Sequence, residues 1–282
     1  MEDIKAMEIA MNYIEMAHVL LSRVLDNVKN SSDKSNDTSI PQLDSMTTFQ
    51  NYIEGDSNKL AREVGISIAE QKEKLSFSPF LVYGPSGCGK THLINAVGVK
   101  YKELNPQGIV IYVGSRQFQM KYTDSVRQNT TNDFINFYQS VDMLIVDDIQ
   151  EWMNAPKTLD TFCYIFNQLV SNGKQVILAS DRPPVKLKGM KKDFLTRFAS
   201  GLVAEIETPD EQLRIDILRA KCQQTGLDVQ DEVIKFIAKN VKGNVCNLEG
   251  VVNSLKAYSM VNIVIDKQLV ERVIKQSINN EH

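Results

Sequence analysis

One segment of the sequence combines glycines, a lysine and a hydroxyl residue at the spacing of a phosphate-binding loop. The apolar run Phe80 to Tyr83 leads into it, and a helical run follows. Glycines let successive backbone N–H groups point at phosphate oxygens, the helix start adds positive potential, and the lysine supplies a cation for the β- and γ-phosphates. The residues expected to contact nucleotide are Gly84, Pro85, Ser86, Gly87, Cys88, Gly89, Lys90, Thr91 and His92.

A pair of aspartates supplies the second half of such a site. Asp147 and Asp148 directly follow the apolar run Met143 to Val146. Asp147 at the end of a buried strand and the Thr91 hydroxyl would hold Mg²⁺, and Asp148 would polarise an attacking water. The sequence therefore predicts ATP or ADP bound with Mg²⁺. The alternative is a strand that ends in solvated aspartates without a chemical role.

A third acidic residue, Asp181, follows the apolar run Val176 to Ala179. In a parallel sheet that binds nucleotide at its carboxyl edge, a polar residue here falls beside the other two elements. Asp181 is therefore a candidate to orient water near the γ-phosphate. Lys90 is expected to be an exposed loop residue that contributes little to the core.

Continuous apolar runs that alternate with helical stretches position these residues. Runs at 80–83, 108–113, 143–146, 176–179 and 202–206 predict five strands, and a helix is expected from Ser57 to about Leu75. Buried strands separated by helices indicate an α/β fold with a parallel sheet covered on both faces. We place this nucleotide-binding domain at residues 47–207.

The remaining segments differ in character. Residues 1–30 predict one amphipathic helix, and the polar run that follows makes residues 31–46 a linker. Residues 208–282 predict a small all-helical domain with helices near 209–224, 229–240, 246–259 and 266–276. Its first helix is expected to start with Thr208 as the cap and Pro209 at the first helical position.

Composition restricts the classes of protein that fit. The four cysteines lack the spacing of a zinc site or a disulfide framework, which fits a reducing compartment. The formal net charge of -3 does not favour bulk nucleic-acid binding. No run approaches the roughly 20 apolar residues of a membrane span, and the N-terminus lacks the pattern of a secretory signal. We therefore expect a cytoplasmic protein with no membrane partner.

With these elements placed, residues from about 47 to 276 resemble DnaA-type bacterial replication initiators of the AAA+ family. The resemblance rests on ordered matches along the chain rather than on one motif. The matching segments are 48–61, the loop at 84–91, 122–127 in a helical insertion at 114–139, 147–150, 179–184, 195–202 and 247–250.

The resemblance implies roles for individual residues. Tyr52, Ile53 and Asn58 would help to hold the adenine. Arg197 would reach the γ-phosphate bound by a neighbouring subunit, so that ATP drives self-association or association with a full-length initiator; a surface arginine in an ordinary ion pair is the alternative. The insertion carries Arg116, Lys121, Tyr122 and Arg127, which suit single-stranded DNA, although a solvated helix face would look the same.

The sequence also departs from the family pattern. Initiators of this family normally end in a helix-turn-helix domain that reads duplex DNA, and this chain ends at His282 after the helical segment. Where the family's lid offers an arginine to the phosphates, this chain has Cys246, and a thiol supplies no positive charge.

Three functions follow from these features. The first is an initiator-type ATPase, with weak hydrolysis, that acts in the initiation or regulation of chromosomal replication. The second is a nucleotide-gated adaptor with little turnover, and the third is a loader of the replicative helicase. The insertion favours the first function over the third.

Overall fold

The fold is described from a computed structural model of residues 43–71, 77–187, 189–190, 192–261 and 265–279. The predicted N-terminal helix and most of the predicted linker lie outside these residues. Residues 43–46, which the sequence assigned to the linker, contact the sheet-containing part of the chain. The Asn95 side-chain amide donates to the carbonyls of Asp44 and Thr47 at 2.8 and 2.9 Å, and its Oδ1 accepts from the Asp44 N–H. The predicted linker, 31–46, therefore included residues that pack against the sheet-containing part.

Five parallel strands form one sheet in the order β2-β3-β4-β1-β5. The predicted parallel fold is therefore confirmed. Strand β2 starts two residues later than the segment 108–113 expected from the sequence. The bounds are β1 Phe80–Tyr83, β2 Val110–Gly114, β3 Met143–Asp147, β4 Gln175–Ser180 and β5 Leu202–Glu205.

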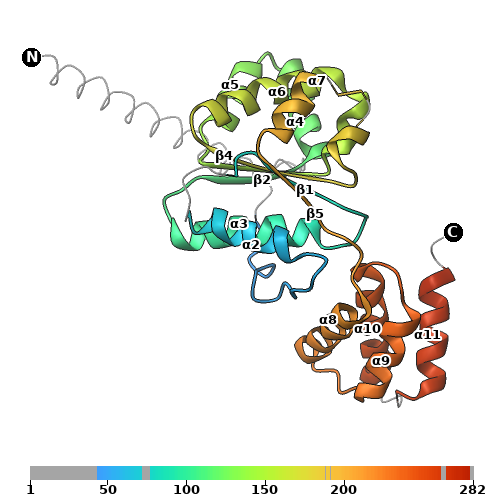
Figure 1. The fold of residues 1–282 in the computed structure, drawn as a ribbon. Coiled ribbons are helices and arrows are strands. Elements are labelled where there is room, and N and C mark those ends of the chain that lie inside the picture. The colour runs from blue at the N-terminus through green and yellow to red at the C-terminus, as the bar shows by residue number, and fades with distance from the viewer. Residues whose placement is uncertain (1–42, 72–76, 188, 191, 262–264, 280–282) are drawn as a thin grey trace, which may run out of the picture. The chain divides into compact units, whose positions relative to one another are not determined.

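Helices cover both faces of this sheet (Figure 1). One layer holds α2 and α3, and the opposite layer holds α4 to α7. Helix α2 begins two residues later than predicted and ends at Ala69, before the predicted end near Leu75. The helix bounds are α2 Lys59–Ala69, α3 Lys90–Leu104, α4 Ser115–Arg127, α5 Thr131–Gln139, α6 Pro156–Ser171 and α7 Lys192–Ala199, with short 3₁₀ helices η1 Ile149–Asn154 and η2 Pro184–Lys186.

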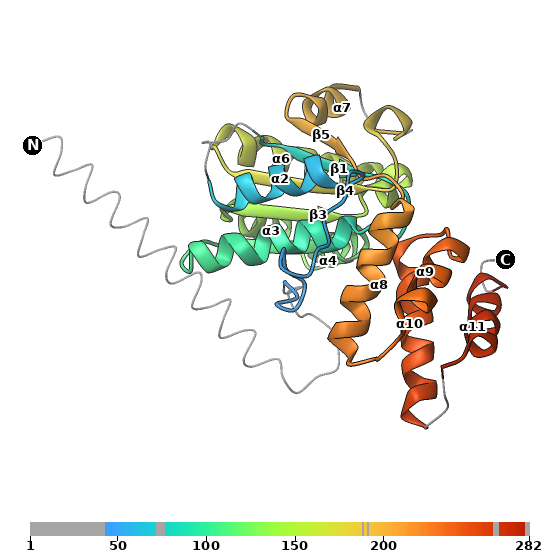
Figure 2. The same cartoon turned by 60° about the horizontal axis from the view of Figure 1, so that its bottom comes forward.

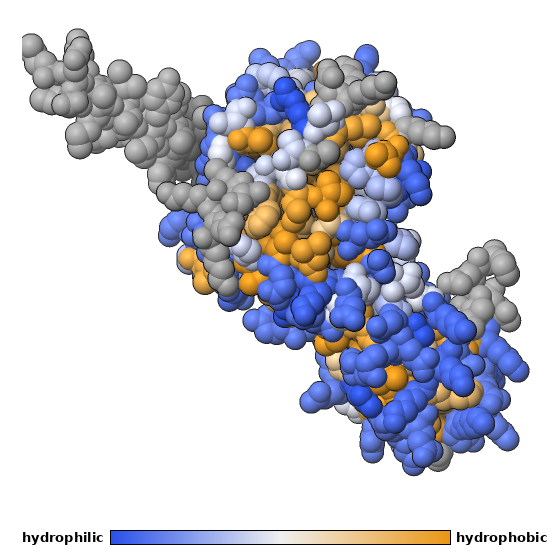
Figure 3. Space-filling view, in the orientation of Figure 1, coloured by the Kyte–Doolittle hydropathy of each residue, from blue (hydrophilic) through white to orange (hydrophobic). Residues whose placement is uncertain are grey.

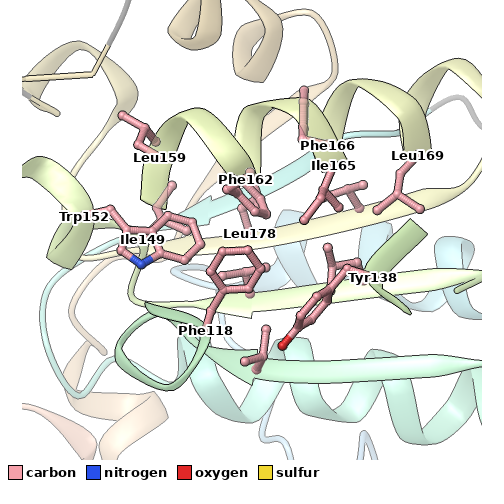
Figure 4. Packing of buried hydrophobic residues seen from close by; sticks show 14 of the residues in the cluster. Phe118, Tyr138, Ile149, Trp152, Leu159, Phe162, Ile165, Phe166, Leu169 and Leu178 are labelled. Carbon is pink, nitrogen blue, oxygen red and sulfur yellow. The ribbon is translucent and has the colours of Figure 1, made fainter. Parts of the chain in front are cut away.

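Alternate strand residues feed two different cores, since successive side chains of a strand point to opposite faces. On the α4–α7 side, Phe118 of α4 packs against Tyr138, Trp152 and Phe162, with ring centroids 4.9 to 5.7 Å apart (Figure 4). This aromatic packing ties the inserted helices to η1 and α6. The α2–α3 side is built around Phe80, Leu93, Ile94 and their aliphatic neighbours.

Four further helices follow the sheet and pack on one another (Figure 2). Their core is separate from the two sheet cores, and their visible face is mostly hydrophilic, whereas apolar residues gather on the visible face of the sheet-containing part (Figure 3). The helical segment predicted after the sheet is present. The helices are α8 Glu211–Thr225, α9 Asp231–Asn240, α10 Val245–Met260 and α11 Lys267–Asn279.

The start of α8 differs from the prediction. Asp210, not Thr208, is the N-cap: its Oδ1 accepts the Leu213 N–H at 2.7 Å. A carboxylate at this position satisfies an orphan N–H and favours the positive helix start. Pro209 lies before the cap, where its carbonyl accepts from the buried Arg214 guanidinium at 2.7 Å.

Candidate nucleotide-binding site

The glycine-rich loop connects β1 to α3 in the conformation that its sequence predicts. Gly87 and Gly89 have φ of 71° and 96°, values that glycine adopts without strain. Gly89 is the residue before the first turn of α3, so the loop ends on a helix N-terminus. The first-turn N–H groups of a helix lack partners within the helix, which makes such a helix start suitable for an anion.

Lys90 is buried rather than exposed, which corrects the expectation from its place in a loop. Only 7% of the residue is accessible. Its ammonium group donates to the carbonyl oxygens of Gly84 and Pro85 at 2.9 and 2.8 Å. The lysine therefore also holds the loop's own shape, and its charge lies inside the loop.

The two predicted metal-holding residues meet at the carboxyl edge of the sheet. The Thr91 hydroxyl donates to Asp147 Oδ2 at 2.6 Å, and Asp147 is 4% exposed. Burial raises the pKa of Asp147, with the neighbouring Asp148 carboxylate acting in the same direction and the Thr91 hydrogen bond opposing it. Hydroxyl and carboxylate oxygens are ligands that suit Mg²⁺, and a cation here would offset the cost of the buried carboxylate.

Asp148 and Asp181 are joined through a residue that sequence reasoning did not single out. The Gln150 side chain donates to Asp148 Oδ1 at 2.9 Å, and its Oε1 accepts the Asp181 N–H at 3.2 Å. Asp148 itself is exposed and has a left-handed backbone, with φ of 57°. The two acidic candidates therefore lie beside each other at the carboxyl ends of adjacent strands.

The Asp181 carboxylate is engaged by its neighbour. Arg182 donates to both carboxylate oxygens of Asp181 at 2.6 Å, and these hydrogen bonds lower the pKa of Asp181. A fork of two charge-assisted bonds fixes the plane of the carboxylate. Orienting a water from this position would require Asp181 to share its oxygens with Arg182.

A cavity of about 340 Å³ lies beside the loop. All three predicted adenine-contacting residues line it, together with Cys88, Gly89 and His92 of the loop and the start of α3. Residues after the sheet complete the wall, and sequence reasoning missed them because nothing local in α8 or α10 indicates a ligand. They include Pro209, Leu213, Ile217, Lys221, Val245 and Glu249.

The polar groups of this cavity are oriented by the segment before α2. Asn58 accepts the Gly55 N–H and donates to the Ile53 carbonyl, so it shapes the turn that carries Tyr52. His92 Nε2 lies 3.0 Å from the Thr48 carbonyl, which makes Nε2 the protonated nitrogen, and burial lowers the pKa of His92. The Ser57 hydroxyl is buried and has no hydrogen-bond partner among the described residues.

Arg197 lies away from this cavity, on the exposed side of α7. Its guanidinium donates to the Asn167 side-chain oxygen on α6. The structure thus does not bring Arg197 to the loop of its own chain. Cys246 is exposed at the start of α10, which lies beside the loop because the Val245 N–H donates to the Gly87 carbonyl at 2.8 Å.

In the insertion at 114–139, both arginines, Arg116 and Arg127, form ion pairs with acidic residues. Arg116 contacts Glu151 at 3.0 Å, and Arg127 contacts Asp124 at 3.4 Å. Tyr122 packs near the Phe134 ring with centroids 5.9 Å apart. These contacts are solvent-exposed or partly so, and such pairs contribute little to stability.

The sheet order, the loop after β1 and the acidic end of β3 define the AAA+ P-loop class of fold. The family model for the bacterial DnaA ATPase domain matches residues 43–205. The chain belongs to this family. Among the described residues, none of the helices has the length and apolar character needed to cross a membrane.

The relatives support this assignment. The chromosomal replication initiator protein DnaA of Bacteroides fragilis is 51% identical over 242 residues, which is 86% of this chain and 51% of that protein. Domain III of the Thermotoga maritima replication initiation protein DnaA has a TM-score of 0.80 and 30% identity, covering 84% of this chain and 99% of that one. A replication initiator DnaA bound to AMPPCP and single-stranded DNA has a TM-score of 0.71 and 36% identity, covering 77% and 66%. The chain spans about half the length of the curated relatives that it matches.

Proposed function

We propose that this chain binds ATP or ADP with Mg²⁺ and acts, as a DnaA-type protein, in the initiation or regulation of chromosomal replication. The observation that carries the proposal is the cavity of about 340 Å³ between the phosphate loop, the segment before α2 and the helices after the sheet. The predicted adenine contacts line this cavity together with Cys88, Gly89 and His92, which supports one nucleotide site. A family relative bound to AMPPCP supports the same ligand class.

The adenine end is the part lined by Tyr52, Ile53 and Asn58. Apolar side chains from α8, among them Leu213 and Ile217, also line the cavity. A flat, mostly apolar base with polar edges suits such a wall, which offers few but directed polar groups. The unpartnered Ser57 hydroxyl is one of these groups.

The phosphate end is the loop from Gly84 to Thr91 with His92 after it. Its N–H groups and Lys90 would neutralise the phosphate chain, while Thr91 and Asp147 would hold Mg²⁺. When bound, the metal neutralises charge on the β- and γ-phosphates. Asp148 and Asp181, which are joined by hydrogen bonds to Gln150, would orient a water beside the γ-phosphate.

Self-association is the proposed role of Arg197. Its position on an exposed face supports action toward a neighbouring molecule, either a second copy or a full-length initiator. A guanidinium suits this task because it stays charged and binds phosphate oxygens with a planar fork. Asn167 holds it against α6 in the single chain.

Single-stranded DNA is a further proposed partner of the insertion formed by α4 and α5. The family relative that binds AMPPCP together with single-stranded DNA supports this partner. Arg116, Lys121, Tyr122 and Arg127 are the residues assigned to it. Because Arg116 and Arg127 already pair with carboxylates, binding would exchange those partners for phosphates.

A nucleotide-gated adaptor with little turnover is the second candidate. Two observations favour slow hydrolysis: Arg182 engages both oxygens of Asp181, and Cys246 offers no positive charge near the loop. Phosphate release measured with and without single-stranded DNA separates the two candidates. Tight ATP binding without release of phosphate identifies the adaptor.

The central test is ATP binding by titration calorimetry with wild type and Lys90→Ala. We expect wild type to bind Mg-ATP and Lys90→Ala to lose binding. Because Lys90 is buried and hydrogen-bonded to the loop, a thermal melt of the variant must accompany the titration. Absence of binding by folded wild type would overturn the proposed function, and full affinity in Lys90→Ala would overturn the assignment of the loop.

A further inference from the structure

Asp147 is surrounded by three hydrogen-bond donors. Its Oδ1 accepts the Asp148 N–H at 2.9 Å, and its Oδ2 accepts both the Thr91 hydroxyl and, at 2.9 Å, the Tyr112 hydroxyl. A carboxylate that is 4% exposed requires such donors because little water reaches it. Asp147 ends β3, and Tyr112 is the donor among these three that comes from the neighbouring strand β2.

The position of Tyr112 follows from the pairing of β2 with β3. Tyr112 lies opposite Ile145, and Gly114 lies opposite Asp147. Tyr112 and Asp147 are therefore on the same face of the sheet, two residues apart along the strand direction. The phenol side chain is long enough to span this offset. Its ring packs against the core on the α2–α3 side.

The two hydroxyl donors differ in what they can do. The Thr91 hydroxyl donates its hydrogen to Asp147 while a lone pair on its oxygen could bind a cation, so Thr91 belongs among the proposed metal-holding residues. Among the described residues, the one hydrogen bond of the Tyr112 hydroxyl is to the Asp147 carboxylate. Donors that orient a metal-binding carboxylate without touching the metal typically change metal affinity by 10–100-fold when they are removed.

We propose that Tyr112 is a positioning residue for the magnesium site, holding Asp147 Oδ2 in the orientation that binds the metal. The inference rests on the proposed binding of Mg-ATP. It predicts that the Tyr112 hydroxyl contributes to the part of ATP affinity that depends on Mg²⁺ and to no other part.

The experiment compares ATP affinity with Mg²⁺ and with EDTA, measured by titration calorimetry on the whole chain. In Tyr112→Phe we expect the gain in affinity from Mg²⁺ to fall about tenfold, with the affinity in EDTA unchanged. Tyr138→Phe is the matched control, because it also removes the hydroxyl of a buried tyrosine but lies in the opposite core. It should keep the full gain from Mg²⁺.

A double-mutant cycle with Asp147→Asn tests the route of the effect. If Tyr112 acts through Asp147, Tyr112→Phe causes no further loss of the Mg²⁺ gain once Asp147 is replaced. The inference is overturned if Tyr112→Phe keeps the wild-type gain, if it weakens binding equally in EDTA, or if its effect persists beside Asp147→Asn. Wild type that fails to bind ATP at all would instead overturn the proposed function.

Discussion

The Val245 N–H of α10 donates a 2.8 Å hydrogen bond to the Gly87 carbonyl of the phosphate loop. The residue before it, Asn244, caps α10 by accepting the Asn247 N–H, and its side chain covers Gly87. The loop and the helices after the sheet are therefore in direct contact at a residue with a left-handed backbone. A change at Gly87 should affect both.

Gly87→Ala should weaken ATP binding and lower the melting temperature. The added Cβ would lie 2.6 Å from Asn244 Cγ, and the φ of 71° is strained for alanine, at a cost of about 1–3 kcal/mol. Gly250→Ala in α10 is the control: its Cβ meets nothing within 4 Å, and alanine in a helix should add about 0.5–1 kcal/mol. If Gly87→Ala had the same melting temperature and the same ATP affinity as wild type, the close contact between Gly87 and Asn244 would be contradicted.

Ser57→Ala should lower ATP affinity without lowering stability. The hydroxyl is buried without a partner among the described residues, so its removal should leave the free energy of unfolding unchanged or raise it. If the hydroxyl bonds the ligand, ATP affinity should fall about fivefold to tenfold. Ser254→Ala, which removes a hydroxyl bonded to Gly250 in α10, should leave ATP affinity as it is. Unchanged ATP affinity in Ser57→Ala would remove this residue from the adenine end.

Arg197→Ala should leave ATP binding intact and abolish ATP-dependent association. The side chain is exposed and outside the cavity, so its loss removes no contact to nucleotide in the same chain. Sedimentation with ATP and with ADP measures the effect. Arg219→Ala, an exposed arginine paired with Asp231 in the C-terminal helices, should associate like wild type. Assembly that persists in Arg197→Ala would show that this residue is not the bridging group.

Asp142→Asn should destabilise the protein in a pH-dependent way. Burial alone would raise the pKa of Asp142, but hydrogen bonds from Lys174 and the Ile109 N–H outweigh it and lower the pKa below its ordinary 3.8. The unfolded chain then takes up its proton at a higher pH than the folded one. The stabilisation is fully present above about pH 5 and is lost as the pH falls through the folded pKa.

Because the pair is about one-third exposed, we expect a difference of about 1 kcal/mol or less between wild type and Asp142→Asn at pH 7. Urea unfolding at pH 7 and at pH 3 measures it. The difference should shrink at the lower pH. A difference that is constant with pH would mean that the asparagine disturbs packing rather than charge.

Local patterns in the sequence account for most of the sheet and for the phosphate loop. The five parallel strands, the loop after β1 and the acidic end of β3 are encoded locally, by apolar runs and by glycine spacing. The N-cap of α8 shows the limit of such patterns, because Thr208 and Asp210 both fit the start signal and only the Leu213 hydrogen bond distinguishes them.

By itself, the sequence of this protein determined which segments become strands and where the glycine-rich loop meets α3, because both depend on near neighbours in the chain. Tertiary structure alone decided that Tyr112 reaches Asp147 and that Leu213 and Ile217 line the cavity. These contacts join residues far apart in the chain, and strand order, register and helix packing set which of them meet.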